Sequence, residues 1–237
     1  MKNKFDLGLR EPKEVVTNKA LSSLDSRTQK YSVLLKELIE TIYKIQGSGK
    51  LEKEDLDKLE EGIMTSWEYV FYYNSGFYLA KLSHYFNEVE ELLIKSSFHK
   101  DFKIRLRIVI ILKARPSEKV LKEILTNCIN DRSKDVRLMV ADVILGGNYK
   151  DLLYLLEDRL SVEPLSNVKK AFERIISLVK NGYFIHKFEN GKFAVWVKHD
   201  GGTASTPMIE ERDLEKYTSK AYIEEIRRKY GVRRGEG

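Results

Sequence analysis

The part of the 237-residue sequence that decides the fold is the stretch Asp131-Arg132-Ser133-Lys134-Asp135-Val136-Arg137. It begins with an acidic residue and ends, six positions later, with a basic one. The same pair returns 32 residues downstream as Glu163 and Lys169. At 32 residues upstream the positions hold His99 and Arg105, so only the basic residue is kept. A fixed spacing of this kind indicates an internal repeat.

Apolar residues follow the same period of 32. Three positions in each copy are apolar and spaced as one buried face of a helix requires. These are Ile104, Val136 and Val168, then Ile108, Val140 and Phe172, then Ile111, Val143 and Ile175. A second helix keeps the register as well, with Leu121 over Leu153, Ile124 over Leu156 and Cys128 over Leu160. The sequence therefore predicts two to three repeats, each made of two helices.

Residues 131–137, followed by Ala141 and Leu145-Gly146, resemble the HEAT and HEAT-like helical-repeat motif. The resemblance covers about residues 99–182. In that family an Asp and an Arg six positions apart bond across the turn and between neighbouring repeats. The resemblance therefore implies an α-α superhelix held by a structural ladder of Asp131, Arg137, Glu163, Lys169 and Arg105. It implies a fold and leaves the function open.

Helical periodicity also extends upstream of the repeats. It predicts one helix that stops at Gly47-Ser48-Gly49, a second from about Glu52 to Tyr73, and a third from Phe77 to Ser96. We expect five segments along the chain: an N-terminal tail or loosely docked arm (1–24), a helical region that could hold degenerate repeats (25–98), the HEAT-like repeats (99–182), a β-hairpin (183–202), and a C-terminal helix with a basic tail (203–237).

The hairpin is predicted from Asn190-Gly191, which lies between two runs of β-forming residues. Asn-Gly favours a two-residue loop. In that register Phe188 faces Phe193, so that Phe184, Phe188, Phe193, Val195 and Val197 share one face. Tyr183 and Trp196 then lie on the outer face. Because a lone hairpin is marginal in water, one face must pack against the helices or against a partner, and a cap on the helical stack is the simplest role. The expected fold is mainly α with this small hairpin.

Composition agrees with a helical protein. Hydrophobic residues make up 42% of the chain, whereas Gly and Pro number only 14 and 4. The net charge of +6 is spread over 42 basic and 36 acidic residues, a mild excess for a dedicated nucleic-acid binder. Cys128 is the only cysteine, which excludes an intramolecular disulfide and a thiolate-built metal site. No signal-peptide pattern and no run of 18 apolar residues occurs, so we expect a cytoplasmic protein without a membrane partner.

Catalytic patterns are absent from the sequence. The four histidines are widely spaced, and neither a P-loop nor a dinucleotide-binding Gly pattern occurs. We therefore expect a non-enzymatic binding or adaptor protein with no cofactor and no metal, whose partner is another protein. Small proteins of this build can also neutralise a toxin, an immunity-type role that rests on analogy of fold alone.

Two sequence features are candidates for contact with a protein partner. The aromatic residues Trp67, Tyr69, Tyr72 and Tyr73 are too many for one helix to bury on one face, although a helix packed on two sides would accommodate them. Tyr183 and Trp196 on the outer face of the hairpin form the second candidate. Tyr and Trp are the residues that interface hot spots favour.

Nucleic-acid binding is the main alternative. A basic tail of Arg227, Arg228, Lys229, Arg233 and Arg234 could contact phosphates. The repeated cations Arg105, Arg137 and Lys169 could do so as well, but we interpret them as structural, each matched to an acidic neighbour. A further alternative is a HEAT-like DNA glycosylase, which would need a carboxylate beside an aromatic cleft.

Overall fold

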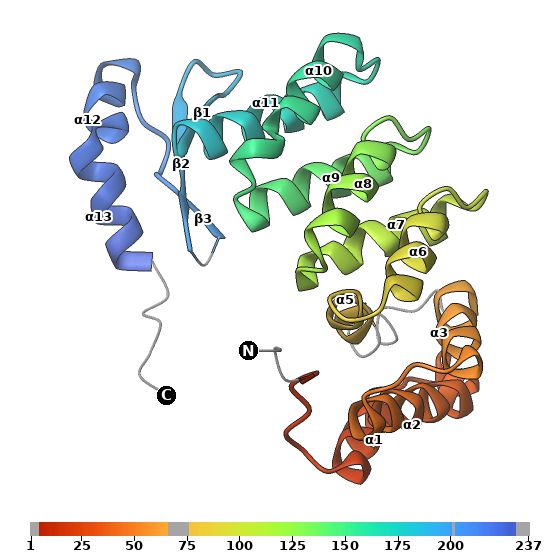
Figure 1. Ribbon diagram of the computed structural model, residues 1–237. Helices are drawn as coiled ribbons and strands as arrows, with labels where there is room; N and C mark the ends of the chain where they lie inside the picture. The colour runs from red at the N-terminus through yellow and green to blue at the C-terminus, as the bar shows by residue number, and fades with distance from the viewer. Residues whose placement is uncertain (1–4, 66–75, 201, 231–237) are drawn as a thin grey trace. The chain divides into compact units, whose positions relative to one another are not determined.

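The computed structural model describes residues 5–65, 76–200 and 202–230 (Figure 1). The protein is mainly helical, at 67%, with twelve α-helices and one three-stranded antiparallel sheet within those ranges. The chain forms two compact units, Met1–Val140 and Ala141–Gly237, here called unit 1 and unit 2. The division falls inside helix α9 (Lys134–Gly147).

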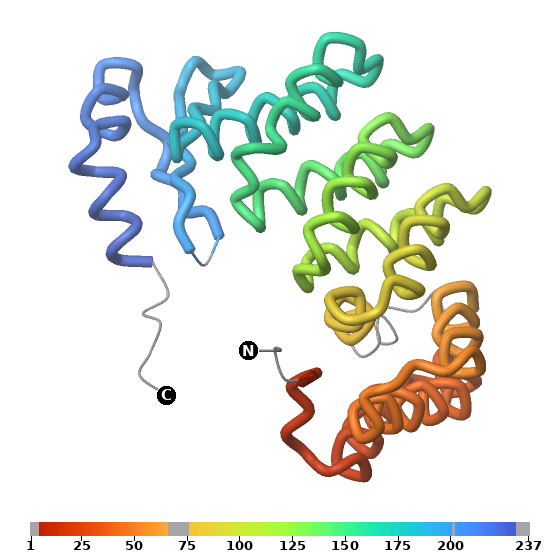
Figure 2. The backbone as a smooth tube through the Cα atoms, in the orientation of Figure 1, coloured from red at the N-terminus to blue at the C-terminus, as the bar shows by residue number. Residues whose placement is uncertain are grey.

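Unit 1 is helical throughout its described part. Besides the first half of α9, it contains α1 (Lys13–Ser22), η1 (Gln29–Tyr31), α2 (Ser32–Ser48), α3 (Lys53–Thr65), α5 (Phe77–Leu82), α6 (Asn87–Ser96), α7 (Phe102–Ile111), η3 (Leu112–Ala114) and α8 (Glu118–Cys128). Figure 2 shows α1, α2 and α3 running side by side in the red and orange part of the backbone. Helix α2 ends where the sequence predicted a stop, because Gly49 adopts a left-handed conformation (φ +64°) and donates its N–H to the Ile45 carbonyl (2.8 Å).

The structure describes the N-terminal segment from residue 5 onward, where the sequence suggested a tail or a loosely docked arm. Residues 13–22 form α1, which packs on α2. Ahead of it Leu7 is fully buried, and its N–H donates to the side chain of Gln46 (2.7 Å). The Tyr43 hydroxyl donates to the Glu11 carbonyl (2.7 Å). Polar contacts to α2 hold this segment, and α1 buries only Ala20, so its sequence has no apolar periodicity to reveal it.

The predicted helix Phe77–Ser96 is wrong in one respect, because the structure breaks it into α5 and α6. The Ser83 hydroxyl donates to the Ala80 carbonyl (2.7 Å), a side-chain bond that competes with helix continuation. Phe86 then adopts an extended conformation (φ −129°, ψ 117°) at the N-cap of α6. Apolar spacing continues across the break, and for that reason the sequence alone suggested one helix.

Three helices begin 32 residues apart. Helices α7, α9 and α11 (Ser166–Lys180) start at residues 102, 134 and 166. The nine apolar positions that defined the period are all buried. Each of the first two is followed by a second helix: α8 after α7, and η4 (Lys150–Leu152) with α10 (Leu153–Val162) after α9. The period found in the sequence is thus a period of helix starts and of buried positions.

Unit 2 adds a sheet and two helices to the remainder of α9, to α10 and to α11. These elements are β1 (Tyr183–Lys187), β2 (Phe193–His199), β3 (Gly202–Ser205), η5 (Glu211–Asp213), α12 (Leu214–Thr218) and α13 (Lys220–Tyr230). The strands are antiparallel in the order β1-β2-β3. The sheet packs against α11 on one side and against α12 and α13 on the other (Figure 1). The sequence predicted two of these strands and one C-terminal helix; the third strand and the break at Ser219 are additions.

The register of the hairpin differs from the predicted one by one residue. Lys187 pairs with Phe193, and Ile185 pairs with Val195. The loop is a turn in which Gly191 donates its N–H to the Phe188 carbonyl (3.0 Å) and adopts a left-handed conformation (φ +78°). Asn190 does not adopt that conformation, which a two-residue type I′ turn requires of both residues. The Asn-Gly pair therefore lies in a three-residue loop instead of the predicted two-residue loop. As a result, the partner of every residue in β1 shifts by one.

This shift moves Tyr183 to the other face of the sheet. Tyr183 pairs with Val197 and packs, partly buried, on an apolar cluster whose buried members are Phe193, Val195, Val197, Ile209 and Ile223. Trp196 pairs with Phe184 and lies on the opposite face. The prediction that Tyr183 and Trp196 share an outer face is wrong for this reason.

Candidate functional site

The ladder cations have defined partners in unit 1. Arg105 in α7 makes two parallel hydrogen bonds to the carboxylate of Asp131 at the start of the next repeat, Nε to Oδ2 (2.5 Å) and Nη2 to Oδ1 (2.8 Å). The two side chains are 14% and 4% exposed. A paired geometry of this type is the strongest that Arg and a carboxylate form. Arg105 and Asp131 thus connect one helix pair to the next within unit 1.

The same arginines also bond to backbone carbonyls, at positions that repeat by 32. Arg105 donates through Nη1 to the carbonyls of His99 (2.5 Å) and Lys100 (3.0 Å). Arg137 donates through Nη1 to those of Asp131 (2.7 Å) and Arg132 (3.2 Å). These carbonyls lie in the turns that precede α7 and α9, so each arginine closes the turn before its own helix.

A side chain at the first ladder position accepts a backbone N–H in all three copies. The N–H donors lie two residues further on: Asp101 to His99 Nδ1 (3.1 Å), Ser133 to Asp131 Oδ1 (2.8 Å) and Leu165 to Glu163 Oε1 (3.2 Å). The His99 ring nitrogen therefore replaces a carboxylate oxygen in this local bond. His99 differs from Asp131 and Glu163 in charge and keeps the hydrogen bond.

The third copy also has a buried carboxylate that accepts from an arginine. Glu163, the C-cap residue of α10, is buried and accepts from Arg159 Nε (3.2 Å) in that helix. The sequence matched Glu163 to Lys169 instead. Lys169 forms no ion pair with any residue in the described ranges, and its side chain is half-exposed. Asp131 and Glu163 are thus both buried carboxylates that accept from an arginine, Arg105 and Arg159 respectively.

Burial and pairing shift the pKa values of the side chains in and around the Arg105–Asp131 pair. Burial alone would raise the pKa of Asp131, but the hydrogen bonds from Arg105 and the Ser133 amide, together with the charges of Arg105 and Arg137, hold that pKa below its ordinary value. The bond from Asp131 raises the pKa of Arg105 in turn. Nearby, burial raises the pKa of the Cys128 thiol to about 12, so this cysteine stays protonated and fills the core.

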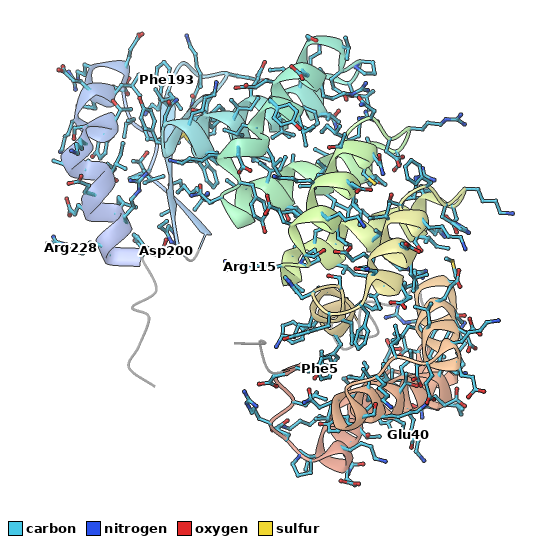
Figure 3. The ribbon with its side chains drawn as sticks, in the orientation of Figure 1. Phe5, Glu40, Arg115, Phe193, Asp200 and Arg228 are labelled. Carbon is cyan, nitrogen blue, oxygen red and sulfur yellow. The ribbon has the colours of Figure 1, made fainter. Side chains whose placement is uncertain are left out.

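The candidate protein-contact residues Trp67, Tyr69, Tyr72 and Tyr73 lie outside the described residues. The aromatic segment continues into the described part at Phe77 and Tyr85, which are 43% and 40% exposed. Phe5, labelled in Figure 3, packs edge-on against Tyr85 with ring centroids 4.8 Å apart. Lys81 lies over the Phe77 ring (4.7 Å) and donates to the Leu7 carbonyl (2.9 Å). The aromatic surface of Phe77 and Tyr85 is therefore open to a protein partner. Its cation, Lys81, is already bonded to the Leu7 carbonyl.

The basic residues at the C-terminus are placed in part. Arg233 and Arg234 lie outside the described residues, while Arg227, Arg228 and Lys229 form the exposed last turn of α13. Arg227 donates through Nε to the Lys198 carbonyl (3.3 Å). Its guanidinium lies against Gly182, where a Cβ atom would stand 1.9 Å from Nη2.

The structure adds residues that sequence reasoning missed. Lys198 in β2 donates through Nζ to the side chain of Asn148 (2.7 Å), which follows the last turn of α9. Lys150 lies two residues further along and donates its own N–H to the Asn148 carbonyl (2.9 Å). The partners are 50 residues apart in the sequence, so no local pattern could bring them together.

Glu90 lies in a polar cluster with Ser117 and Lys119. The Ser117 hydroxyl donates to Glu90 Oε1 (2.5 Å), and Lys119 pairs with the same carboxylate (3.1 Å). These contacts lower the pKa of Glu90, the bond from Ser117 most, so the carboxylate is ionised and a weak base. Ser117 also caps α8 by accepting the Val120 N–H. The cluster therefore has a structural role as a helix cap.

In residues 5–65, 76–200 and 202–230 there is no group of three His, Cys, Asp or Glu side chains placed to hold a metal ion. Over the same ranges no helix is both long and apolar enough to cross a bilayer. Compared with known protein families, with curated proteins and with solved structures, the chain gives no significant match.

Proposed function

We propose that residues 99–182 are HEAT-like repeats and that the protein is a non-enzymatic scaffold which binds another protein. The observation that carries this proposal is the repetition of bonds at an offset of 32. A side chain at 99, 131 and 163 accepts the N–H two residues on, and an arginine at 105 and 137 bonds the same two turn carbonyls. In the family that the sequence resembles, such bonds hold the stack together.

The C-terminal sheet supports the same proposal. The last repeat helix, α11, would leave an apolar face open at the end of a stack, and the ends of helical stacks need covers. Within unit 2, β1 and β2 pack on α11, and α12 and α13 cover the other side of the sheet. We therefore interpret the sheet as the cap of the repeats. Cys128, buried and unpaired, fits the reducing cytoplasmic setting that belongs to this proposal.

The surface that we assign to the protein partner is the aromatic one. Its described members are Phe77 and Tyr85, and its sequence continues into Trp67, Tyr69, Tyr72 and Tyr73. Large exposed aromatic side chains contribute much of the binding energy at protein interfaces. A phosphate-rich ligand is less suitable here, because Lys81 is already bonded to the Leu7 carbonyl and covers the Phe77 ring.

Affinity purification with two matched double variants tests this proposal. The first is Phe77→Ser with Tyr85→Ser. The second, Val33→Ser with Phe98→Ser, removes two apolar side chains that are 67% and 66% exposed in the same unit. We expect one protein to co-purify with the wild type and the control and to fall at least about tenfold with the aromatic variant, a loss typical of a hot spot. Equal recovery with both variants, or no specific protein with the wild type, would overturn the proposal.

Nucleic-acid binding is the second candidate, and one observation favours it. Arg227, Arg228 and Lys229 lie together on the last turn of α13, and none of them has a carboxylate partner among the described residues. Binding to a labelled oligonucleotide should then weaken as salt rises. It should also be lost when Arg227, Arg228, Arg233 and Arg234 are all changed to Gln. Absence of oligonucleotide affinity at low salt would exclude this candidate.

A further inference from the structure

Three cations from separate elements of unit 2 lie close together, and we call them the cation group: Lys150 of η4, Lys198 of β2 and Arg227 of α13. Asn148 links the first two, because its side chain accepts from Lys198 Nζ (2.7 Å) and its carbonyl accepts the Lys150 N–H (2.9 Å). Arg227 bonds the backbone of Lys198 itself (3.3 Å). Figure 3 shows Asp200 and Arg228, the neighbours of these residues, at the same end of unit 2.

The backbone is shaped to hold the cation group in place. Asn148 adopts a left-handed conformation (φ +54°) at the end of α9, which is rare for a residue other than glycine. Gly182 is left-handed as well (φ +82°), and its missing Cβ leaves the space that the Arg227 guanidinium occupies. Its carbonyl also accepts the Lys198 N–H (2.8 Å). The C-terminal ends of α9 and α11 thus fix Lys198 and Arg227 through Asn148 and Gly182.

No carboxylate neutralises these charges. Within the described ranges Lys150, Lys198 and Arg227 form no ion pair, although other cations of unit 2 do, such as Lys180 with Glu157 and Lys192 with Glu210. Burial lowers the pKa of Lys198, and the positive charges of Lys150 and Arg227 lower it further, against the single opposing charge of Asp200. Two exposed cations beside a partly buried lysine raise the free energy of the protein, and a bound anion would lower it.

We propose that Lys150, Lys198 and Arg227 form a binding site for a phosphate group. Both terminal amino groups of the Arg227 guanidinium are without a hydrogen bond to any described residue, and a guanidinium presents such pairs of donors to two phosphate oxygens at once. Lys198 has two ammonium hydrogens left after its bond to Asn148, and Lys150 supplies a third cation. Three charges suit the two negative charges of a phosphate better than the single charge of a carboxylate.

The phosphate can come from two sources, a free phosphate or phosphate ester, or the backbone of a nucleic acid. The site goes beyond the protein-binding scaffold and does not depend on the aromatic surface or on the HEAT-like repeats. Trp196 is a convenient reporter, because it lies two residues before Lys198 on the same face of β2. In a Trp67→Phe background it is the only tryptophan, since the chain has two.

The experiment titrates that single-tryptophan protein, followed by Trp196 fluorescence, with inorganic phosphate and separately with a single-stranded 12-nucleotide RNA. Lys198→Gln with Arg227→Gln removes one lysine and one arginine from the cation group. Lys170→Gln with Arg174→Gln is the matched control, because it removes the same charges from the exposed face of α11. Circular dichroism spectra confirm that all variants are folded.

We expect the first double variant to weaken binding at least tenfold and the control to stay within twofold of the parent protein. If phosphate and RNA both bind and both depend on Lys198 and Arg227, the site takes free phosphate. If only the RNA binds with that dependence, the nucleic-acid backbone is the source. The proposal is overturned if neither probe binds at 50 mM salt, or if the control weakens binding as much as the first variant does.

Discussion

The arginine ladder of unit 1 and the cation group of unit 2 carry similar charge and differ in their partners. Arg105 meets a buried carboxylate in a two-bond geometry, and Arg105 and Arg137 both close the turns before their helices. The side chains of Lys198 and Arg227 bond an amide and a carbonyl oxygen, and within the described residues Lys150 forms no ion pair. A net charge of +6 does not distinguish these two situations, because it counts cations without their neighbours. A matched cation stabilises the fold, whereas an unmatched group is available to a ligand.

The largest effect on the free energy of unfolding is expected for the cation that is paired with a carboxylate, Arg105. Asp131→Ala leaves the Arg105 guanidinium buried without its carboxylate, and removing one partner of a buried ion pair typically destabilises a protein by about 3–5 kcal/mol. The free energy of unfolding, measured by urea titration, should fall by that amount. Asp135→Ala is the control, because this carboxylate is exposed in the first turn of α9, just after Asp131, and its loss should change stability by less than about 1 kcal/mol. Similar losses of unfolding free energy in both variants would contradict a structural role for the Arg105–Asp131 pair.

Within the cation group of unit 2, the largest effect on stability is expected from a substitution of Gly182, which lies against Arg227. Gly182→Ala places a side chain in a left-handed conformation, at a penalty of about 1–2 kcal/mol, and the new methyl group also collides with Arg227. Gly191→Ala has the same conformational penalty without a neighbour within 4 Å. Gly182→Ala should therefore destabilise the protein more than Gly191→Ala does. Adding Arg227→Ala to Gly182→Ala should remove the excess, which a double-mutant cycle in urea measures.

The pH dependence of stability sharpens the account of Asp131. Its pKa in the folded protein lies below its ordinary value of 3.8. The stabilisation by its pairing is therefore complete above the unfolded pKa and is lost as the pH falls through the folded pKa. The difference in unfolding free energy between the wild type and Asp131→Asn should be constant from pH 7 to pH 5 and should narrow as the pH is lowered to 3. A difference that stays constant down to pH 3 would mean that the carboxylate charge is not what stabilises the turn.

Lys198 should show the smallest effect. Its pKa is lowered in the folded protein, so the unfolded chain binds the proton more tightly and stability rises as the pH increases toward the ordinary value of 10.5. Lys198→Met should leave the stability at pH 7 within about 1 kcal/mol of the wild type and should flatten this rise. Urea titrations at pH 7, 8 and 9 test it. A loss as large as that of Asp131→Ala would place Lys198 among the structural cations.

The features of the fold that could be predicted from the sequence are those carried by local periodicity. The positions of Ile104, Val136 and Val168 gave the period, and the helices α7, α9 and α11 begin 32 residues apart. The end of α2 at Gly49 followed from a glycine that can turn left-handed. These signals depend on residues within one helix or one turn, which a single sequence displays directly.

The remaining features depend on choices that a single sequence leaves open. Asn190-Gly191 is compatible with two loop lengths, and the one-residue difference decides on which face Tyr183 lies. The N-terminal segment is held by polar contacts to Gln46 and Tyr43, which leave no apolar pattern. In the candidate site the basic residues of α13 were recognised by composition, but Lys150 and Lys198 were not, because 48 positions separate them in the chain.

The distinction between the two groups of cations is tested most directly by one phosphate titration on two single variants, Arg105→Gln and Arg227→Gln, each in the Trp67→Phe background and each kept under conditions where it is folded. The difference in partners predicts that Arg105→Gln binds inorganic phosphate with the affinity of the parent protein, although it unfolds at lower urea concentration. It predicts that Arg227→Gln binds at least several-fold more weakly. Equal affinity in the two variants, or weaker binding by Arg105→Gln, would contradict the division of the cations into a structural and a ligand-binding group.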